Sequence, residues 1–103
     1  MEKIYLVFDE FIYNGTDQVL DIIPCATMDI AVKVLKRRYE WYLIESCFQV
    51  FVEQCEDGRL CPRKELLGKN DLWEVNEDSV EIFICDKDIR LNLHIAEEPV
   101  VCE

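Results

Sequence analysis

The sequence predicts an α+β fold in one domain, in which an antiparallel sheet of about four to five strands carries one main helix on one face. Three observations support this prediction. The 103 residues, 1–103, suffice for a single domain, and half of them are hydrophobic. Apolar and polar residues alternate near both ends of the chain, as they do in half-buried strands. Between these segments, apolar residues recur at helical spacing over residues 28–45.

The N-terminal segment predicts a β-hairpin. Residues 3–13, KIYLVFDEFIY, are apolar on both faces over their first half, so this strand is expected inside the sheet rather than at its edge. Asn14-Gly15 follows, and both residue types tolerate the positive φ of a tight turn. Residues 18–24 then return as the second strand, which ends at Pro24 because proline has no N–H for a ladder.

The helix over residues 28–45 is predicted from its start signals and its apolar stripe. Thr27 is the expected N-cap, and Asp29 lies in the first turn, where the helix dipole favours an acid. The core-facing stripe is expected to include Leu35, Tyr39 and Tyr42.

The opposite side of this helix is basic. It carries Lys33, Lys36, Arg37 and Glu40, with Arg38 at its margin. Such a run is typical of a solvated helix face. The alternatives are an internal counter-charge for the acidic ends of the chain and a small docking patch.

The middle of the chain is less regular. Residues 47–55 alternate as a strand would, yet they also continue the helical stripe; their β-branched and aromatic content favours a strand over residues 47–54. Residues 56–72 contain turn-forming glycine, proline and asparagine, and are therefore predicted to be a loop with at most one helical turn near Arg63 to Leu67.

Residues 79–95 show the clearest strand pattern and predict an antiparallel hairpin that turns at residues 86–88. This register would place His94 opposite about Glu81. Trp73 is expected to pack over the base of the hairpin, and residues 97–103 are expected to form a tail that frays.

The cysteines are expected to be free thiols. Their positions are Cys25, Cys47, Cys55, Cys61, Cys85 and Cys102, without any C-x-x-C pair and with His94 as the single histidine. Structural zinc sites use closely spaced ligand pairs, so no metal and no cofactor is predicted. Free cysteine behaves as a small buried hydrophobe, which suits Cys25 and Cys47, whereas Cys102 is expected to be the most exposed thiol.

Several classes of protein are disfavoured. No apolar run approaches the roughly 18 residues of a membrane span, and the first residues are acidic where a secretory signal is cationic. A cytoplasmic protein without membrane contact is therefore expected. A Cys85–His94 catalytic pair is disfavoured, because the predicted hairpin separates the two residues along the strand. No catalytic residue and no enzymatic activity is predicted.

The net charge of −11 is concentrated in the last third, where residues 71–103 hold ten acids and two bases. Such a surface repels nucleic-acid phosphates, so direct nucleic-acid binding is not expected, whereas the basic surface of a protein would be attracted. The candidate binding residues form an anionic surface: Asp71, Glu74, Glu77, Asp78, Glu81, Asp86 and Asp88. The alternative is that this charge only keeps the domain soluble.

The first third resembles a plan common among small acidic orphan proteins of phages and other mobile elements. There, a hairpin leads through a short Ser/Thr-x-Asp/Glu-x-Ala segment into a helix, as in Thr27-Met28-Asp29-Ile30-Ala31 here. That group includes inhibitors of bacterial defence, such as anti-CRISPR and anti-restriction proteins, some of which act as DNA mimics that occupy a basic groove. The resemblance therefore implies an inhibitor of a nucleic-acid-binding host protein.

Two other functions remain open at the level of sequence. One is a protein–protein adaptor or homodimer, for which an exposed apolar patch around Phe11, Tyr13 or Phe83 would be evidence. The other is a thiol-dependent enzyme or a zinc protein.

Overall fold

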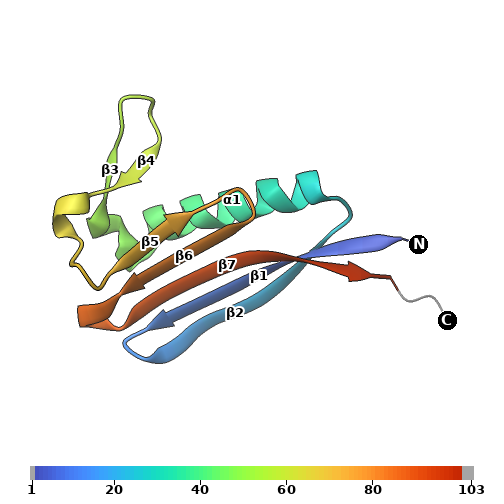
Figure 1. Cartoon of the computed structure of the whole chain (residues 1–103), viewed down its shortest axis with the longest axis horizontal. Coiled ribbons are helices and arrows are strands. Elements are labelled where there is room, and N and C mark those ends of the chain that lie inside the picture. The colour runs from blue at the N-terminus through green and yellow to red at the C-terminus, as the bar shows by residue number, and fades with distance from the viewer. Residues whose placement is uncertain (1, 101–103) are drawn as a thin grey trace.

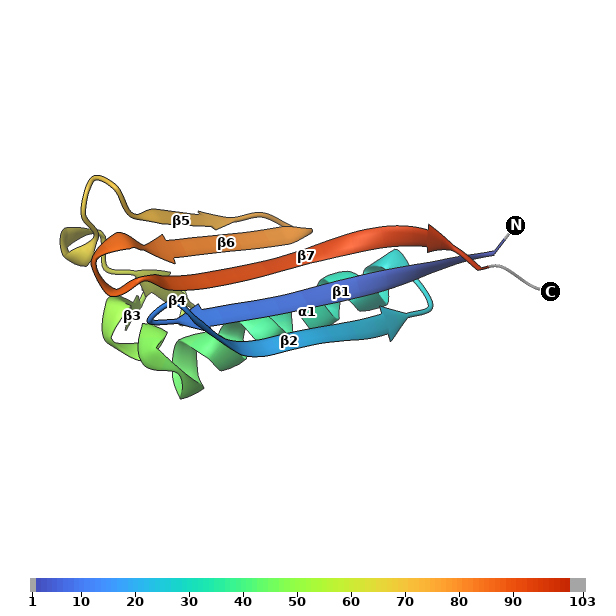
Figure 2. The same ribbon diagram turned by 90° about the horizontal axis from the view of Figure 1, so that it is seen from below.

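The computed structural model describes residues 2–100 and confirms the α+β fold class. Five antiparallel strands form one sheet in the order β2-β1-β7-β6-β5 (Figure 1). Their bounds are β1 (Lys3–Tyr13), β2 (Thr16–Cys25), β5 (Leu72–Val75), β6 (Ser79–Ile84) and β7 (Ile89–Pro99). The main helix, α1 (Met28–Glu45), lies along one face of this sheet, and Figure 2 shows the two layers from the side.

The first hairpin and the helix have the predicted form. Strand β1 lies between β2 and β7, in the interior of the sheet, and Asn14 and Gly15 both adopt positive φ in the turn. The helix spans the predicted residues, and the Thr27 hydroxyl caps it by accepting the N–H of Ile30 at 3.2 Å. This hairpin and helix bring the first 45 residues into a two-layer unit.

The core lies between α1 and the sheet. The helix contributes Leu35 and Tyr42 to it as predicted, whereas Tyr39 is only half-buried. The sheet contributes mainly the alternate residues of β6 and β7, together with Val7 and Phe11 of β1. The opposite helix face, with Lys33, Lys36, Arg37 and Glu40, is exposed as expected.

The strand predicted over residues 47–54 is wrong for most of its length. Residues Cys47–Phe51 form a 3-10 helix, η1, and only Val52–Gln54 is a strand, β3. The Ser46 hydroxyl caps the turn by accepting the N–H of Phe48 at 3.3 Å. Phe48 and Phe51, three residues apart, share one side of the turn and are both buried. Burial of this pair outweighs the strand preference of the segment.

The loop predicted over residues 56–72 contains more structure than expected. Leu60–Pro62 forms β4, which pairs with β3 in a separate two-stranded hairpin. A 3-10 turn, η2 (Lys64–Leu66), lies where one helical turn was allowed, and β5 begins at Leu72. Trp73 therefore belongs to the sheet itself, where it meets Phe48 edge to face.

The expectation that all the cysteines are free is also wrong, because Cys55 and Cys61 form a disulfide across the β3–β4 hairpin. The Gly58 turn returns the chain so that their Cα atoms lie 6.0 Å apart. Cys25 is buried as predicted, Cys47 is half-buried, and Cys85 is exposed. Cys102 lies outside the described residues.

The C-terminal hairpin is confirmed, but its register differs from the prediction. The turn includes a 3-10 helix, η3 (Cys85–Lys87), and Ile84 pairs with Ile89, so that Ser79 rather than Glu81 faces His94. Strand β7 also continues to Pro99, opposite Lys3, where the sequence predicted the start of a frayed tail. The long partner strand β1 supplies the ladder that this segment joins. Within residues 2–100, no helix is long and apolar enough to cross a membrane.

Candidate binding face

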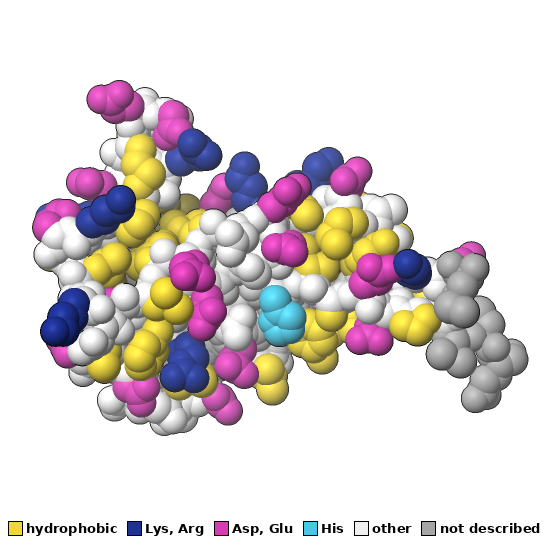
Figure 3. Space-filling view, viewed as in Figure 1, with side chains coloured by type: hydrophobic (Ala, Val, Ile, Leu, Met, Phe, Trp, Pro, Cys, Tyr) yellow, Lys and Arg dark blue, Asp and Glu magenta, His cyan; other side chains and the backbone are white. Residues whose placement is uncertain are grey.

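One face of the five-stranded sheet is not covered by the helix, and this side is termed the open face. Alternation along β1 directs Val7, Asp9 and Phe11 towards α1, so Leu6, Phe8 and Glu10 point to the open face. Figure 3 looks onto this face, where acidic side chains lie above and to the left of the single histidine and hydrophobic side chains lie to its right. A surface of this kind is available to a partner.

Carboxylates form a row across the open face. Glu74 on β5 faces Glu81 on β6, Glu81 faces Asn92 on β7, and Asn92 faces Glu10 on β1. Strands lie about 4.8 Å apart, so the backbone places Glu74 and Glu81 about 5 Å apart and Glu10 about 10 Å beyond them. None of these three acids is in an ion pair within residues 2–100. The row, Glu10, Glu74 and Glu81, is termed the acidic row.

Aromatic side chains border the acidic row on both sides. On one side, the rings of Phe8 and His94 stack with centroids 4.7 Å apart and planes within 5°. On the other, the guanidinium of Arg90 lies 4.9 Å from the ring centroid of Phe83. Stacking on an aromatic ring is a favourable position for an arginine, and Arg90 shows that this face accommodates one.

Six of the seven candidate residues from the sequence fall into three groups. Glu74 and Glu81 lie together on the open face, Glu77 and Asp78 lie in the β5–β6 turn, and the Asp86/Asp88 pair lies in the β6–β7 turn at the other end. Strand β6 between the two turns has six residues, which is roughly 20 Å of extended chain. The candidate anions therefore spread along the hairpin rather than forming one continuous row.

Asp71 has a different position, because its carboxylate is used inside the protein. One oxygen accepts the N–H of Gly68 at 2.7 Å and the other accepts the N–H of Cys85 at 2.8 Å. The side chain thereby ties the loop before β5 to the turn after β6. Glu10 was not among the candidates, yet it belongs to the acidic row, whereas Asp71 does not. The signal that could have identified Glu10 is its parity with Phe8 on a strand that is central in the sheet.

The open face also exposes apolar side chains near its β2 edge. Leu20 is 69% exposed and Ile22 is 55% exposed. Of the three residues expected in an apolar patch, Phe11 is buried in the core, Tyr13 is exposed and Phe83 is half-buried beneath Arg90. The exposed apolar surface therefore lies on β2 rather than around Phe11.

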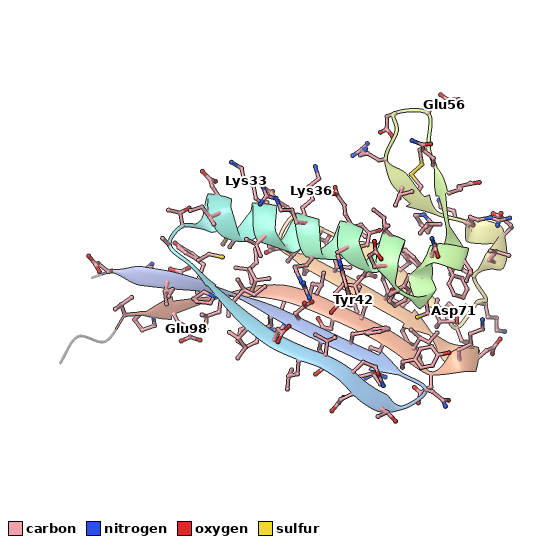
Figure 4. All side chains as sticks on the ribbon, turned by 180° about the vertical axis from the view of Figure 1, so that it is seen from behind. Lys33, Lys36, Tyr42, Glu56, Asp71 and Glu98 are labelled. Atoms are coloured by element: carbon pink, nitrogen blue, oxygen red, sulfur yellow. A yellow bond between two sulfur atoms is a disulfide. The ribbon has the colours of Figure 1, made fainter. Side chains whose placement is uncertain are left out.

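A buried ion pair between the two layers was not predicted as a contact. Asp9 is fully buried, and its Oδ2 atom accepts the Nε–H of Arg38 at 2.7 Å. Arg38 also lies over the rings of Trp41 and Tyr42, at 5.2 and 5.5 Å from their centroids. The alternative reading of the basic helix segment as an internal counter-charge thus holds for Arg38. Figure 4 shows Tyr42 pointing towards the sheet, while Lys33 and Lys36 point away from it.

Burial changes the acid–base properties of this group. Burial raises the pKa of Asp9 despite the opposing effect of Arg38, and it raises the pKa of Tyr42 to about 12. Within residues 2–100, Asp9 Oδ1 and the Tyr42 hydroxyl have no hydrogen-bond partner. The pair is therefore a structural contact between helix and sheet rather than an exposed binding group.

The described residues give little support to a metal site or to a catalytic cysteine. Residues 2–100 contain no cluster of three His, Cys, Asp or Glu side chains suited to a metal ion. Burial raises the pKa of the Cys47 thiol, which disfavours its nucleophilic thiolate form. Cys85 lies in the β6–β7 turn, whereas His94 pairs with Ser79 at the far end of β6.

Comparison with known proteins adds no functional assignment. No protein-family model matches the chain, and no curated protein and no solved structure matches it either.

Proposed function

We propose that this chain is a non-enzymatic binding protein that docks the open face of its sheet on a basic surface of another protein. The partner in this proposal is a nucleic-acid-binding host protein, and the chain, encoded by a phage or mobile element, inhibits it by occupying its phosphate-binding groove. The observation that carries the proposal is the acidic row on a sheet face that no other layer of residues 2–100 covers.

The chemistry of the open face supports a cationic partner. Carboxylates at separations of about 5 to 10 Å can each meet an arginine or lysine that ordinarily binds phosphate. Phe8 and Phe83 border them, but His94 and Arg90 already stack on these rings, so the cations of a partner would bind through the carboxylates of the acidic row. The remaining acids of the β5–β6 and β6–β7 turns add long-range attraction, which speeds association and makes it sensitive to salt.

The proposal places this activity in the cytoplasm, where reducing conditions act against disulfides. The acidic row contains no cysteine, and the Cys55–Cys61 disulfide belongs to the separate β3–β4 hairpin. Binding through the open face is therefore expected to be equal for the oxidised and the reduced protein.

The experiment is capture of partners from host lysate by the immobilised chain at about 50 mM and about 300 mM salt. An electrostatic complex with many contacts should lose orders of magnitude in affinity over this range. The proposal expects a nucleic-acid-binding protein that is retained only at low salt and that free DNA displaces. A partner that is retained at high salt, or that DNA does not displace, contradicts it.

A second candidate function is an adaptor or homodimer that uses the apolar edge of the same face. Its evidence is the exposure of Leu20 and Ile22 on strand β2. An apolar interface is insensitive to salt, so the two-salt capture separates the two candidates. Replacement of Leu20 and Ile22 by serine should abolish such an interface and leave electrostatic capture unchanged.

A further inference from the structure

We infer that a second site, on the helix side of the sheet, binds an extended apolar peptide of a partner protein, which adds as a sixth strand at the free edge of β5. This site lies on the opposite layer from the open face. It is therefore independent of the function proposed above.

The site is a groove of about 870 Å³ between α1, the β3–β4 hairpin and strands β5 and β6. Helix α1 packs mainly on β1, β7 and β2, so it covers the β5–β6 half of this sheet face less closely. Most of the lining is apolar, and its main members are Leu35, Tyr39, Ile44, Leu60, Trp73 and Val75. The indole N–H of Trp73 donates to the Tyr39 hydroxyl at 3.1 Å and joins the floor of the groove to the helix.

The backbone of β5 indicates what fits beside this groove. The N–H of Asn76 donates to the carbonyl of Ser79 at 2.7 Å and closes the β5–β6 hairpin. Residue pairs that exchange backbone hydrogen bonds alternate with pairs that do not along an antiparallel ladder. Because Asn76 bonds to Ser79, Glu74 also bonds to β6 through its backbone, whereas Trp73 and Val75 direct their N–H and C=O groups to the outer edge. β5 is the last strand of the sheet, and no group in residues 2–100 bonds to these outward positions.

An extended peptide matches both features at once. Its backbone can pair with the outward groups of Trp73 and Val75, as in other recognition by strand addition. Alternate side chains of the added strand would point to the same side as the Trp73 and Val75 side chains, which is into the groove. Val75 is 48% exposed, so this apolar surface is open to contact.

The charges around the groove favour a neutral apolar peptide. The lining contains Lys36 and Arg59 together with Glu40 and Glu77, so its charges balance although the chain as a whole is strongly acidic. A second copy of the chain fits less well. The register that pairs the outward groups of Trp73 with those of Val75 in the copy would set Glu74 against Glu74, and like charges directly opposite are destabilising.

The test uses the full chain and a displayed library of random peptides, from which binders are selected. The inference expects enriched peptides with alternating apolar residues, and amide chemical-shift changes at Trp73 and Val75 when a selected peptide is added. Val75→Pro removes one outward N–H without breaking the β6 ladder, because proline is tolerated where its nitrogen faces away from the sheet. Loss of that hydrogen bond should weaken the selected peptide by about tenfold.

Leu20→Glu is the control, because it changes an exposed apolar residue of the open face, outside the groove, and this variant should bind the peptide as the original chain does. If Val75→Pro unfolds, Ile44→Glu provides a second variant, because Ile44 lines the groove from the helix and is 52% exposed. Unchanged peptide binding by whichever of Val75→Pro and Ile44→Glu remains folded would overturn the inference. The absence of enriched peptides, or amide chemical-shift changes confined to the open face, would also overturn it. A dimer of the original chain that Val75→Pro dissociates would also overturn it in favour of a second copy. None of these outcomes depends on capture through the acidic row.

Discussion

Replacement of Arg38 by methionine should destabilise the protein strongly, because it leaves the Asp9 carboxylate buried without its counter-charge. Asp9 is fully buried, and the Arg38 side chain is 28% exposed. Breaking a buried ion pair by removal of one partner costs about 3–5 kcal/mol. Because Arg38 is partly solvated, we expect the lower end, about 3 kcal/mol, which corresponds to a fall in melting temperature of roughly 12–24 °C.

The assay is urea denaturation at pH 7, with Arg37→Met as the control. Arg37 is the neighbouring exposed residue, and its replacement should change the free energy of unfolding by no more than about 0.5 kcal/mol. The double variant Asp9→Leu with Arg38→Met should recover most of the loss, because an apolar pair can replace a buried ion pair. If Arg38→Met is no less stable than Arg37→Met, the reasoning about this pair is refuted.

The remaining predictions concern other contacts. First, the native pKa of Asp9 lies above its ordinary value of 3.8, so between these two values the native state holds a proton that the unfolded state releases. The contribution of Asp9 to the free energy of unfolding is therefore complete below pH 3.8 and is lost as the pH rises through the native pKa. The difference in unfolding free energy between the original chain and Asp9→Asn, followed from pH 3 to 7, should therefore fall with pH, and a flat difference contradicts the assignment. Second, Thr27→Ala should cost about 1 kcal/mol through loss of the helix cap, whereas Thr27→Ser should not, as thermal melts would show. Third, reduction of the Cys55–Cys61 disulfide should speed amide exchange in residues 52–62 only, and faster exchange in β7 would argue against a separate hairpin.

The elements with a regular period could be predicted from the sequence. Helix α1, strand β1 and the C-terminal hairpin each bury side chains in the core, and the spacing of their hydrophobic residues indicates which side is buried. Short elements such as β3 and β4 carry only three residues each, too few for a period to be recognised. The turn at Gly58 brings them together, and the Cys55–Cys61 disulfide links the two arms of the hairpin.

The acidic character of the candidate site was predicted from the sequence, but the residues that come together in it were not. Acidity of the last third identified Glu74 and Glu81, but Glu10 joins them only because β1 and β7 become neighbours from opposite ends of the chain. The ion pair between Asp9 and Arg38 likewise forms only because α1 packs on β1, and the alternation of residues within β1 does not predict this contact. Long-range register therefore determines which charges meet and which are used internally.

The central claim is that the acidic row, rather than total charge, makes the binding surface. Two triple variants with the same net charge test it: Glu10→Gln with Glu74→Gln and Glu81→Gln, and Glu45→Gln with Glu53→Gln and Glu56→Gln. The second set is exposed on the helix end and the β3–β4 hairpin, away from the open face. We expect low-salt capture of the partner to be lost in the first variant and retained in the second. Equal capture by the two variants would contradict the account.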